Sequence, residues 1–265
     1  MNENAIPLQK FSMVERLLGM LEKLGKPLRK GARILEFGCG AGKLVYEFRD
    51  QGFECFGYDL HEIPILRSEK DKSFFRSMKK PGDPSNYSHD WQTFSLPYPD
   101  SEFDFIFSSQ VLEHVQNHPK VFTELSRISK PGNVSIHVFP PRYQFIESHM
   151  FVPLAGIFQS FPYFFFWAAL GIRNGFQEGK SAWETAQLNL KYAHSGINYL
   201  PPKTLLKLGR EYFGRAEYIP EIWDVVYFGT CPNSPFWKKW YSFTDTSVLM
   251  LEKRLRVTSG NCGNE

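Results

Sequence analysis

A glycine-rich turn between two short apolar stretches is the first feature of this sequence that could do chemistry. The run Gly38-Cys39-Gly40-Ala41-Gly42 follows the apolar segment Arg33–Phe37 and precedes a predicted helix over residues 43–51. Glycines at such a turn let the backbone pass close to a ligand, and the N-terminus of the next helix presents free N–H groups. The spacing is G-x-G-x-G, which differs from the dinucleotide-binding pattern G-x-G-x-x-G.

Two carboxylates flank this turn. Glu36 stands two positions before the first glycine, and Asp59 ends the next apolar segment, 17 residues past the last glycine. A carboxylate at the end of a second parallel strand can accept hydrogen bonds from both hydroxyls of a ribose. The alternative is a purely structural glycine turn with a solvated aspartate.

The elements around the turn follow a regular order. A strand, a glycine turn, a helix and a second strand make a βαβ unit, which implies a parallel sheet with right-handed crossovers. Residues 11–28 are predicted to form a helix before this unit, and 62–89 one short helix within a loop. The later predictions are strands over 103–108, 134–139, 216–222 and 224–230, helices over 119–129, 182–190, 202–213 and the second half of 235–256, and a turn at 130–133.

Four motifs in this order resemble those of class I S-adenosylmethionine (SAM)-dependent methyltransferases, especially the small-molecule and quinone-biosynthesis type. They are Ile34-Leu35-Glu36-Phe37-Gly38-Cys39-Gly40-Ala41-Gly42, Leu96-Pro97-Tyr98-Pro99-Asp100-Ser101-Glu102-Phe103-Asp104, Ser109-Gln110-Val111-Leu112-Glu113-His114-Val115 and Ser129-Lys130-Pro131-Gly132, where Asn133 replaces the family's last glycine. The resemblance implies an α/β fold: a Rossmann-like, doubly wound, mostly parallel sheet of seven strands with an antiparallel edge strand. It also implies a helical, aromatic-rich insert after the fifth strand.

The same resemblance implies the residues that bind SAM. Glu36 and the backbone of Gly38, Cys39, Gly40 and Gly42 would hold the methionine part. Asp59 would bind the ribose, with Leu60 beside the adenine, and Ser109 and Gln110 would line the cofactor near its sulfonium. Asp90, Trp91 and Gln92 are the candidates for the adenine site, although the segment before them is more polar than is usual in the family.

Histidines are the candidates for acid–base chemistry. Methyl transfer from a sulfonium mainly requires alignment and exclusion of water, and a base helps when the acceptor is a hydroxyl. His114 and His149 both follow predicted strands at the ligand end of the sheet. A packed, hydrogen-bonded role is the alternative for His114. Glu147 with His149 lacks a third partner at a known spacing, so we expect no metal site.

Aromatic residues concentrate in one uncharged segment. The chain has 25 Phe, 12 Tyr and 6 Trp, and residues 150–172 carry no charged side chain. That length could span a bilayer, but Pro153, Gly156, Pro162 and Gly171 disfavour a transmembrane helix. A packed helical layer, a lid over a hydrophobic acceptor and a peripheral membrane contact are the three remaining interpretations.

We expect a SAM-binding core over residues 1–140, an insert over 141–200 and completion of the sheet over 201–265.

Composition excludes some partners. The formal charge is only +3 in 265 residues, with no basic stripe, so a nucleic-acid substrate is not expected. Four cysteines without a C-x-x-C pair and an N-terminus without a signal sequence predict a cytoplasmic protein, with a peripheral membrane contact as an option.

The predicted function is SAM-dependent methyl transfer to a small acceptor that is hydrophobic, lipid-linked or of glycan type. The alternative is a non-catalytic protein of the same fold, which docks a membrane or another subunit through its aromatic insert. This alternative predicts intact glycines but an acceptor cavity that is blocked by side chains of the insert.

Overall fold

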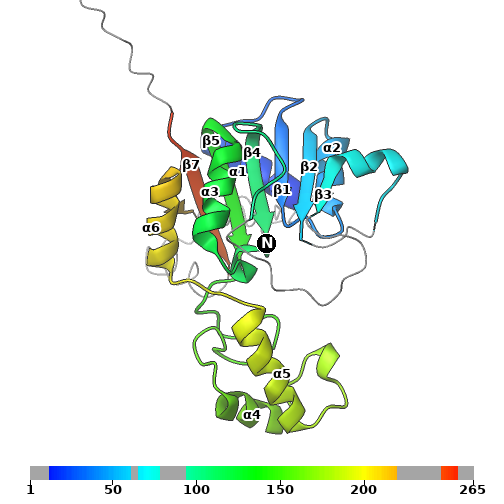
Figure 1. Ribbon diagram of the computed structural model, residues 1–265, viewed down its shortest axis with the longest axis vertical. Helices are drawn as coiled ribbons and strands as arrows, with labels where there is room; N and C mark the ends of the chain where they lie inside the picture. The colour runs from blue at the N-terminus through cyan, green and yellow to red at the C-terminus, as the bar shows by residue number, and fades with distance from the viewer. Residues whose placement is uncertain (1–11, 61–64, 78–93, 220–245, 256–265) are drawn as a thin grey trace, which may run out of the picture.

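A mixed seven-stranded sheet forms the centre of the molecule (Figure 1). The computed structural model describes residues 12–60, 65–77, 94–219 and 246–255. The strands are ordered β3-β2-β1-β4-β5-β7-β6, and all pairs are parallel except those of β7 with β5 and with β6. Their bounds are β1 Arg33–Phe37, β2 Glu54–Asp59, β3 Phe75–Ser77, β4 Phe103–Ser109, β5 Ser129–Phe139, β6 Gly214–Tyr218 and β7 Ser247–Lys253.

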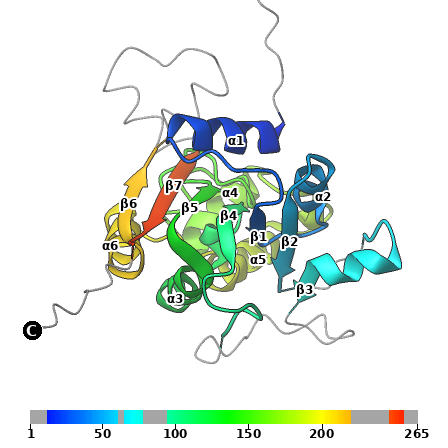
Figure 2. The same ribbon diagram turned by 90° about the horizontal axis from the view of Figure 1, so that it is seen from above.

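Helices cover both faces of this sheet (Figure 2). On one face, α1 (Met13–Lys23) and α2 (Lys43–Asp50) contribute Val14, Leu17 and Phe48 to a buried cluster with β1 and β4. On the other face, α3 (His118–Ile128) and α6 (Pro202–Tyr212) pack against the sheet through a second cluster. The inner strands are therefore apolar along most of their length, as is usual for parallel strands that are covered on both faces.

The insert after β5 is a separate helical unit. It contains α4 (Phe161–Ala169), the short 3₁₀ helix η3 (Gly175–Gln177) and α5 (Ala182–Ser195), and these elements lie beyond one end of the sheet in Figure 1. Its interior is a third hydrophobic cluster, which includes Met150, Val152, Phe164 and Ala186. Part of the aromatic segment is therefore core, because Phe164 is fully buried between the helices of the insert.

The predicted fold class is confirmed, whereas several local predictions need correction. The second half of 235–256 is not helical, because Ser247–Lys253 forms β7, whose apolar side chains are buried between β5 and β6. The antiparallel strand is thus β7, which lies one position in from the edge strand β6. The strand predicted over 224–230 lies outside the described residues. The predicted turn at 130–133 lies inside β5, where the register with β4 shifts from Phe103↔Ser129 to Phe105↔Val134.

Two short elements occupy the segment between β2 and β4. The 3₁₀ helix η1 (Glu69–Phe74) runs directly into β3, a three-residue strand that the sequence analysis did not predict. Its Phe75 packs beside the glycine turn, where a Cβ on Gly42 would lie 2.6 Å from the Phe75 ring. This contact and the left-handed φ of +76° both favour glycine at the last position of the turn.

Candidate active site

A cavity of about 630 Å³ opens at the carboxyl ends of β1, β2 and β4. Ligands bind at this end of an open parallel sheet, where neighbouring crossovers leave a crevice. One side of the cavity is formed by the glycine turn and the end of β2, and the opposite side by α5 of the insert. The lining residues are Phe37, Gly38, Gly40, Tyr58, Asp59, Leu60, Phe94, Gln110, Val111, His114, Val115, Gln116, Leu188, Lys191, Tyr192, Ser195 and Gly196.

The glycine turn has the backbone conformation that its sequence predicted. Gly38, Gly40 and Gly42 have φ values of +78°, +48° and +76°, in the left-handed region that favours glycine. A Cβ on Gly38 would lie 2.2 Å from Val111, whereas a Cβ on Gly40 would meet no atom within 4 Å. Gly40 therefore faces open space beside the cavity, which leaves its backbone accessible to a ligand.

Asp59 links the end of β2 to this turn. Its Oδ2 accepts a hydrogen bond of 2.7 Å from the backbone N–H of Gly40, and its side chain lines the cavity. Glu36 lies deeper, with only 4% of its surface exposed and Oε2 without a hydrogen-bond partner among the described residues. Burial raises the pKa of the Glu36 carboxyl well above its ordinary value, and the charge of Asp59 adds to this effect.

The predicted cofactor residues fall into three groups. Gly38, Gly40, Asp59, Leu60 and Gln110 line the cavity. The second group lies within two positions of a lining residue in the chain without belonging to that set: Glu36, Cys39, Gly42 and Ser109. Asp90, Trp91 and Gln92 lie outside the described residues.

Gln110 has a strained backbone at the end of β4. It has a φ of +58°, which is uncommon for a residue other than glycine. Its N–H donates a 2.8 Å hydrogen bond to the carbonyl of Val138 in β5, which holds the chain in this conformation. Backbone strain of this kind is concentrated at functional sites, and here it turns the chain from β4 into the cavity wall.

His114 lies on the side of the cavity that faces the insert. It ends the 3₁₀ helix η2 (Leu112–His114), and its Nδ1 is 2.6 Å from the carbonyl oxygen of Gly196. Since a carbonyl only accepts, Nδ1 carries the proton and Nε2 is left as an acceptor. Burial lowers the pKa of His114, and the bond to Gly196 opposes this only in part. A neutral imidazole with an accepting Nε2 is the form that a general base requires.

His149 does not line the cavity but lies directly behind His114. The two imidazole rings are 4.9 Å apart and nearly perpendicular, and the ring of Tyr192 lies 5.6 Å from His149 on another side. Its Nδ1 is 2.7 Å from Oε1 of Glu147. Burial alone would lower the pKa of His149, but the bond to Glu147 and the charge of that residue raise it overall.

Glu147 is the centre of a buried polar network. Its carboxylate accepts hydrogen bonds from the backbone N–H groups of His149 and Met150 and from the Tyr199 hydroxyl. Burial favours the neutral carboxyl, but these bonds and His149 lower the pKa of Glu147 overall. The Gln144 side chain in turn donates to the Tyr199 hydroxyl at 3.0 Å. This network holds the chain after β5 in one position relative to the insert.

Glu113 is a polar residue to which the sequence analysis gave no role. It is 1% exposed, and neither carboxylate oxygen has a hydrogen-bond partner among the described residues. Burial raises the pKa of Glu113 to about 7. Its position next to His114 in a motif at the end of a strand was the only signal in the sequence.

The α5 residues Leu188, Lys191 and Tyr192 line the cavity but were not predicted, because nothing in their spacing distinguishes a cavity wall from an ordinary helix face.

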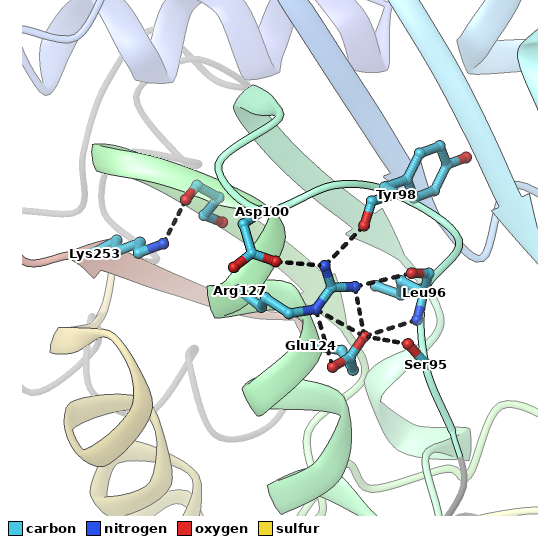
Figure 3. Close-up of polar contacts among 8 residues, drawn as sticks. Ser95, Leu96, Tyr98, Asp100, Glu124, Arg127 and Lys253 are labelled. Carbon is cyan, nitrogen blue, oxygen red and sulfur yellow. Dashed lines mark hydrogen bonds and ion pairs between the residues drawn. The ribbon is translucent and has the colours of Figure 1, made fainter.

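A hydrogen-bonded network fixes the loop before β4 (Figure 3). Arg127 of α3 donates to the backbone carbonyls of Leu96 and Tyr98 and pairs with Asp100 and Glu124. Glu124 also accepts from the backbone N–H of Leu96 at 2.8 Å. The loop 95–100 is thereby fixed between α3 and the start of β4, directly after Phe94, which lines the cavity.

The glycine turn after β1, the Asp59 carboxylate at the end of β2 and the order of the strands are those of a Rossmann-like methyltransferase fold. Comparison with known proteins agrees. The profile of the family described as "Methyltransferase domain" matches residues 11–212. The chain therefore belongs to this family, the class I SAM-dependent methyltransferases. Within the described ranges, no helix is long and apolar enough to cross a membrane.

Relatives with described activities resemble only part of this chain. Norajmaline N-methyltransferase of Rauvolfia serpentina is 29% identical over 45% of this chain and 40% of its own length. The 27-O-demethylrifamycin SV methyltransferase of Amycolatopsis mediterranei is 30% identical over 45% of this chain and 41% of its own. The matched region thus spans less than half of either relative.

A solved structure extends the similarity to nearly the whole chain. Phosphoethanolamine N-methyltransferase 2 of Haemonchus contortus, in complex with SAM, has a TM-score of 0.50 at 12% identity. The match covers 94% of this chain and 55% of that chain. At this identity, the likeness shows the shared fold alone.

Proposed function

We propose that this protein transfers a methyl group from SAM to a small hydrophobic acceptor that binds between the glycine turn and α5. One observation carries this proposal: a single cavity extends from Gly40 and Asp59 at the sheet to His114 after β4 and Tyr192 of the insert. A cofactor at the first end and an acceptor at the second would meet within one cavity. Holding both reactants in one geometry is the main requirement of this reaction.

The residues at the sheet end fit SAM. We assign the ribose hydroxyls to Asp59, because its carboxylate lies at the end of β2 and faces the cavity. The methionine part is assigned to the backbone of Gly38, Cys39, Gly40 and Gly42, with Glu36 behind them. Left-handed glycines give this ligand close access to the backbone, and Glu36 offers a buried oxygen that has no hydrogen-bond partner among the described residues. Leu60 would contact the adenine, and Ser109 and Gln110 would lie near the sulfonium.

When bound, SAM supplies an activated methyl group, so the chain needs little acid–base apparatus. Transfer to a hydroxyl forms a carbon–oxygen bond, breaks the carbon–sulfur bond and releases one proton. His114 is placed to accept that proton at Nε2, because its Nδ1 is held by the Gly196 carbonyl. His149 supports the His114 ring from behind.

An apolar lining supports a hydrophobic acceptor. Phe37, Phe94, Val111 and Leu188 all contribute to the cavity wall. Burying apolar surface stabilises a bound acceptor by about 25 cal/mol per Å². Lipid-linked and glycan-bearing molecules remain within this proposal, since Lys191, Gln116 and Ser195 add polar groups at the same end.

The open cavity favours an enzyme over a non-catalytic binding protein. A binding protein of this fold was expected to have its acceptor space filled by side chains of the insert. Instead, α5 forms one wall of a cavity whose volume of about 630 Å³ includes both the glycine-turn end and the space beside the insert. We therefore propose that residues 141–200 form a cap on the cofactor-binding core, with 201–265 completing the sheet.

We also propose that the insert makes a peripheral membrane contact through residues 150–172. Within α4, only Phe164 and Ala168 are buried, and the helix has no charged residue. Phe158, Phe165, Phe166 and Leu170 are 40–62% exposed. A cluster of exposed apolar side chains at one end of a molecule is typical of interaction surfaces. Such a contact would let a cytoplasmic enzyme collect an apolar acceptor from a bilayer.

Calorimetry and labelled transfer test this function. We expect SAM and S-adenosylhomocysteine (SAH) to bind with a stoichiometry of one, and label from [methyl-³H]SAM to appear in lipid, quinone or glycan extracts. If neither SAM nor SAH binds, the cofactor assignment is contradicted. Binding without transfer to any of the three extracts would instead favour the non-catalytic alternative.

A further inference from the structure

Three side chains that could bind a metal ion meet at the wall of the cavity. Glu113 and His114 follow β4, whereas His149 follows β5, 35 residues later in the chain. One donor atom from each of them lies within 4.8 Å of the other two. The sequence predicted no metal site because Glu147 and His149 lacked a third partner, but the fold brings His149 to a different pair of residues.

Each histidine has one nitrogen committed and one left for a ligand. Nδ1 of His114 is bound to the Gly196 carbonyl, and Nδ1 of His149 is bound to Glu147. The protons on both Nδ1 atoms leave both Nε2 atoms as acceptors. Metal-binding histidines almost always donate their other N–H to a carbonyl or a carboxylate, which fixes the ring and makes the ligand more basic. Both kinds of support are present here.

Glu113 supplies an independent indication of a missing ligand. Its carboxylate is 99% buried, because only 1% of the residue is exposed, yet neither oxygen has a hydrogen-bond partner among the described residues. Its Oε1 points toward His114 and lies 3.8 Å from Nε2, which is beyond hydrogen-bonding distance. A buried carboxylate normally requires a cation or several donors. A metal ion between Glu113 and the two imidazoles would satisfy it.

We propose that Glu113, His114 and His149 bind one divalent transition-metal ion, with zinc the best match to two imidazoles and one carboxylate. Zinc sites that catalyse reactions commonly have three protein ligands and one open position. Donors about 2.1 Å from one ion lie about 3.4 Å apart in a tetrahedron, so each side chain end would move inward by less than about 1 Å. The supporting bonds of Gly196 and Glu147 would remain.

The open coordination position would face the acceptor. Of the three ligands, His114 lines the cavity, so an acceptor hydroxyl in the cavity can approach the same ion. A bound zinc ion lowers the pKa of a coordinated oxygen, which would release the hydroxyl proton to solvent before methyl transfer. In this state His114 acts as a ligand and not as the base. This role, unlike the metal site itself, rests on the proposed function.

Metal titration of the untagged, chelator-treated protein tests the site. We expect one equivalent of Co²⁺ to give a visible ligand-field spectrum that one equivalent of Zn²⁺ abolishes, with both affinities measured by calorimetry. Glu113→Gln and His149→Ala should each weaken binding at least tenfold, whereas His194→Ala, which removes an exposed histidine of α5, should not change it. SAH binding by every variant reports that its core is folded.

Two outcomes would overturn the site: no Co²⁺ spectrum in the wild-type protein, or unchanged metal affinity in both Glu113→Gln and His149→Ala. If one of these two variants loses SAH binding, the metal affinity of the other variant decides whether the site exists. The catalytic role is tested separately, by comparing methyl transfer in chelator-treated and zinc-loaded protein. Equal rates would contradict that role and leave the proposed function intact, whereas zinc binding without any methyl transfer would contradict the function and leave the site intact.

Discussion

Asp59 and Gly40 are joined by a hydrogen bond of 2.7 Å, from the Gly40 backbone N–H to Oδ2 of Asp59. This bond connects the end of β2 to the middle of the turn after β1, so one carboxylate both shapes the glycine turn and faces the cavity. Two features that are 19 residues apart in the chain therefore form a single binding surface.

Replacement of Asp59 should separate cofactor binding from folding. We expect Asp59→Ala to weaken SAH binding by roughly 10- to 100-fold, because hydrogen bonds to a charged group contribute about 1.5–3 kcal/mol. Calorimetry with SAH measures the change. Glu54→Ala is the matched control, since Glu54 is exposed at the opposite end of the same strand. Equal losses in the two variants would show that Asp59 has no direct role in binding.

A methyl group on Gly40 should obstruct the cofactor more than it harms the fold. Alanine at φ +48° costs about 1 kcal/mol of stability through backbone strain. Its Cβ meets no protein atom within 4 Å, so we expect Gly40→Ala to reduce the affinity for SAH more than it reduces the stability of the fold. Gly25→Ala carries the same kind of strain at φ +68°, far from the cavity, and also meets no atom. Denaturant unfolding and calorimetry on both variants check the prediction, which fails if Gly40→Ala binds SAH as Gly25→Ala does.

His118 should make the protein less stable in mild acid. It is 2% exposed, and its Nε2 lies 2.9 Å from the Leu112 carbonyl, which it holds at the start of η2. Burial lowers the pKa of His118 to about 4. The unfolded chain, with a pKa near 6.5, binds the proton more readily between these values, so folding stability falls as the pH decreases from about 6.5 to 4.

The contribution of His118 can be isolated by comparison with His118→Gln, which keeps a donor but does not titrate. Between pH 7.5 and 5, we expect the wild-type protein to lose about 2 kcal/mol more unfolding free energy than the variant. Urea unfolding at the two pH values measures both differences. An identical pH dependence would mean that the imidazole of His118 is protonated equally in the folded and unfolded states.

The exposed aromatic side chains of the insert should determine membrane binding. We expect the triple variant Phe165→Ser, Phe166→Ser and Leu170→Ser to reduce sedimentation with phosphatidylcholine–phosphatidylglycerol liposomes by at least threefold. Because these side chains are 40–62% exposed, their loss should change stability little. Ile65→Ser, at a 58% exposed position on the core, serves as the control. Wild-type protein that remains in the supernatant would contradict the membrane contact.

Local sequence signals were sufficient for the first half of the fold. The glycine turn, the apolar strands beside it and the carboxylate of Asp59 are close in sequence, and their chemistry depends mainly on backbone conformation at single residues. The order of β1, α2 and β2 was therefore predictable, and their bounds were predictable within one or two residues. β7 was not, because the run Ser247–Lys253 is compatible with a helix, and only its burial between β5 and β6 makes it a strand.

The sequence by itself determined the class of fold and the end of the cavity that the glycine turn and Asp59 line, because glycine, aspartate and strand periodicity act through neighbouring residues. Tertiary structure decided the opposite end of the cavity, beside the insert. Glu113 and His149 come from different connections, and Gly196 and Asn198, directly after α5, are bonded to the chain after β4. Contacts between such distant segments depend on how the insert packs, which no local spacing encodes.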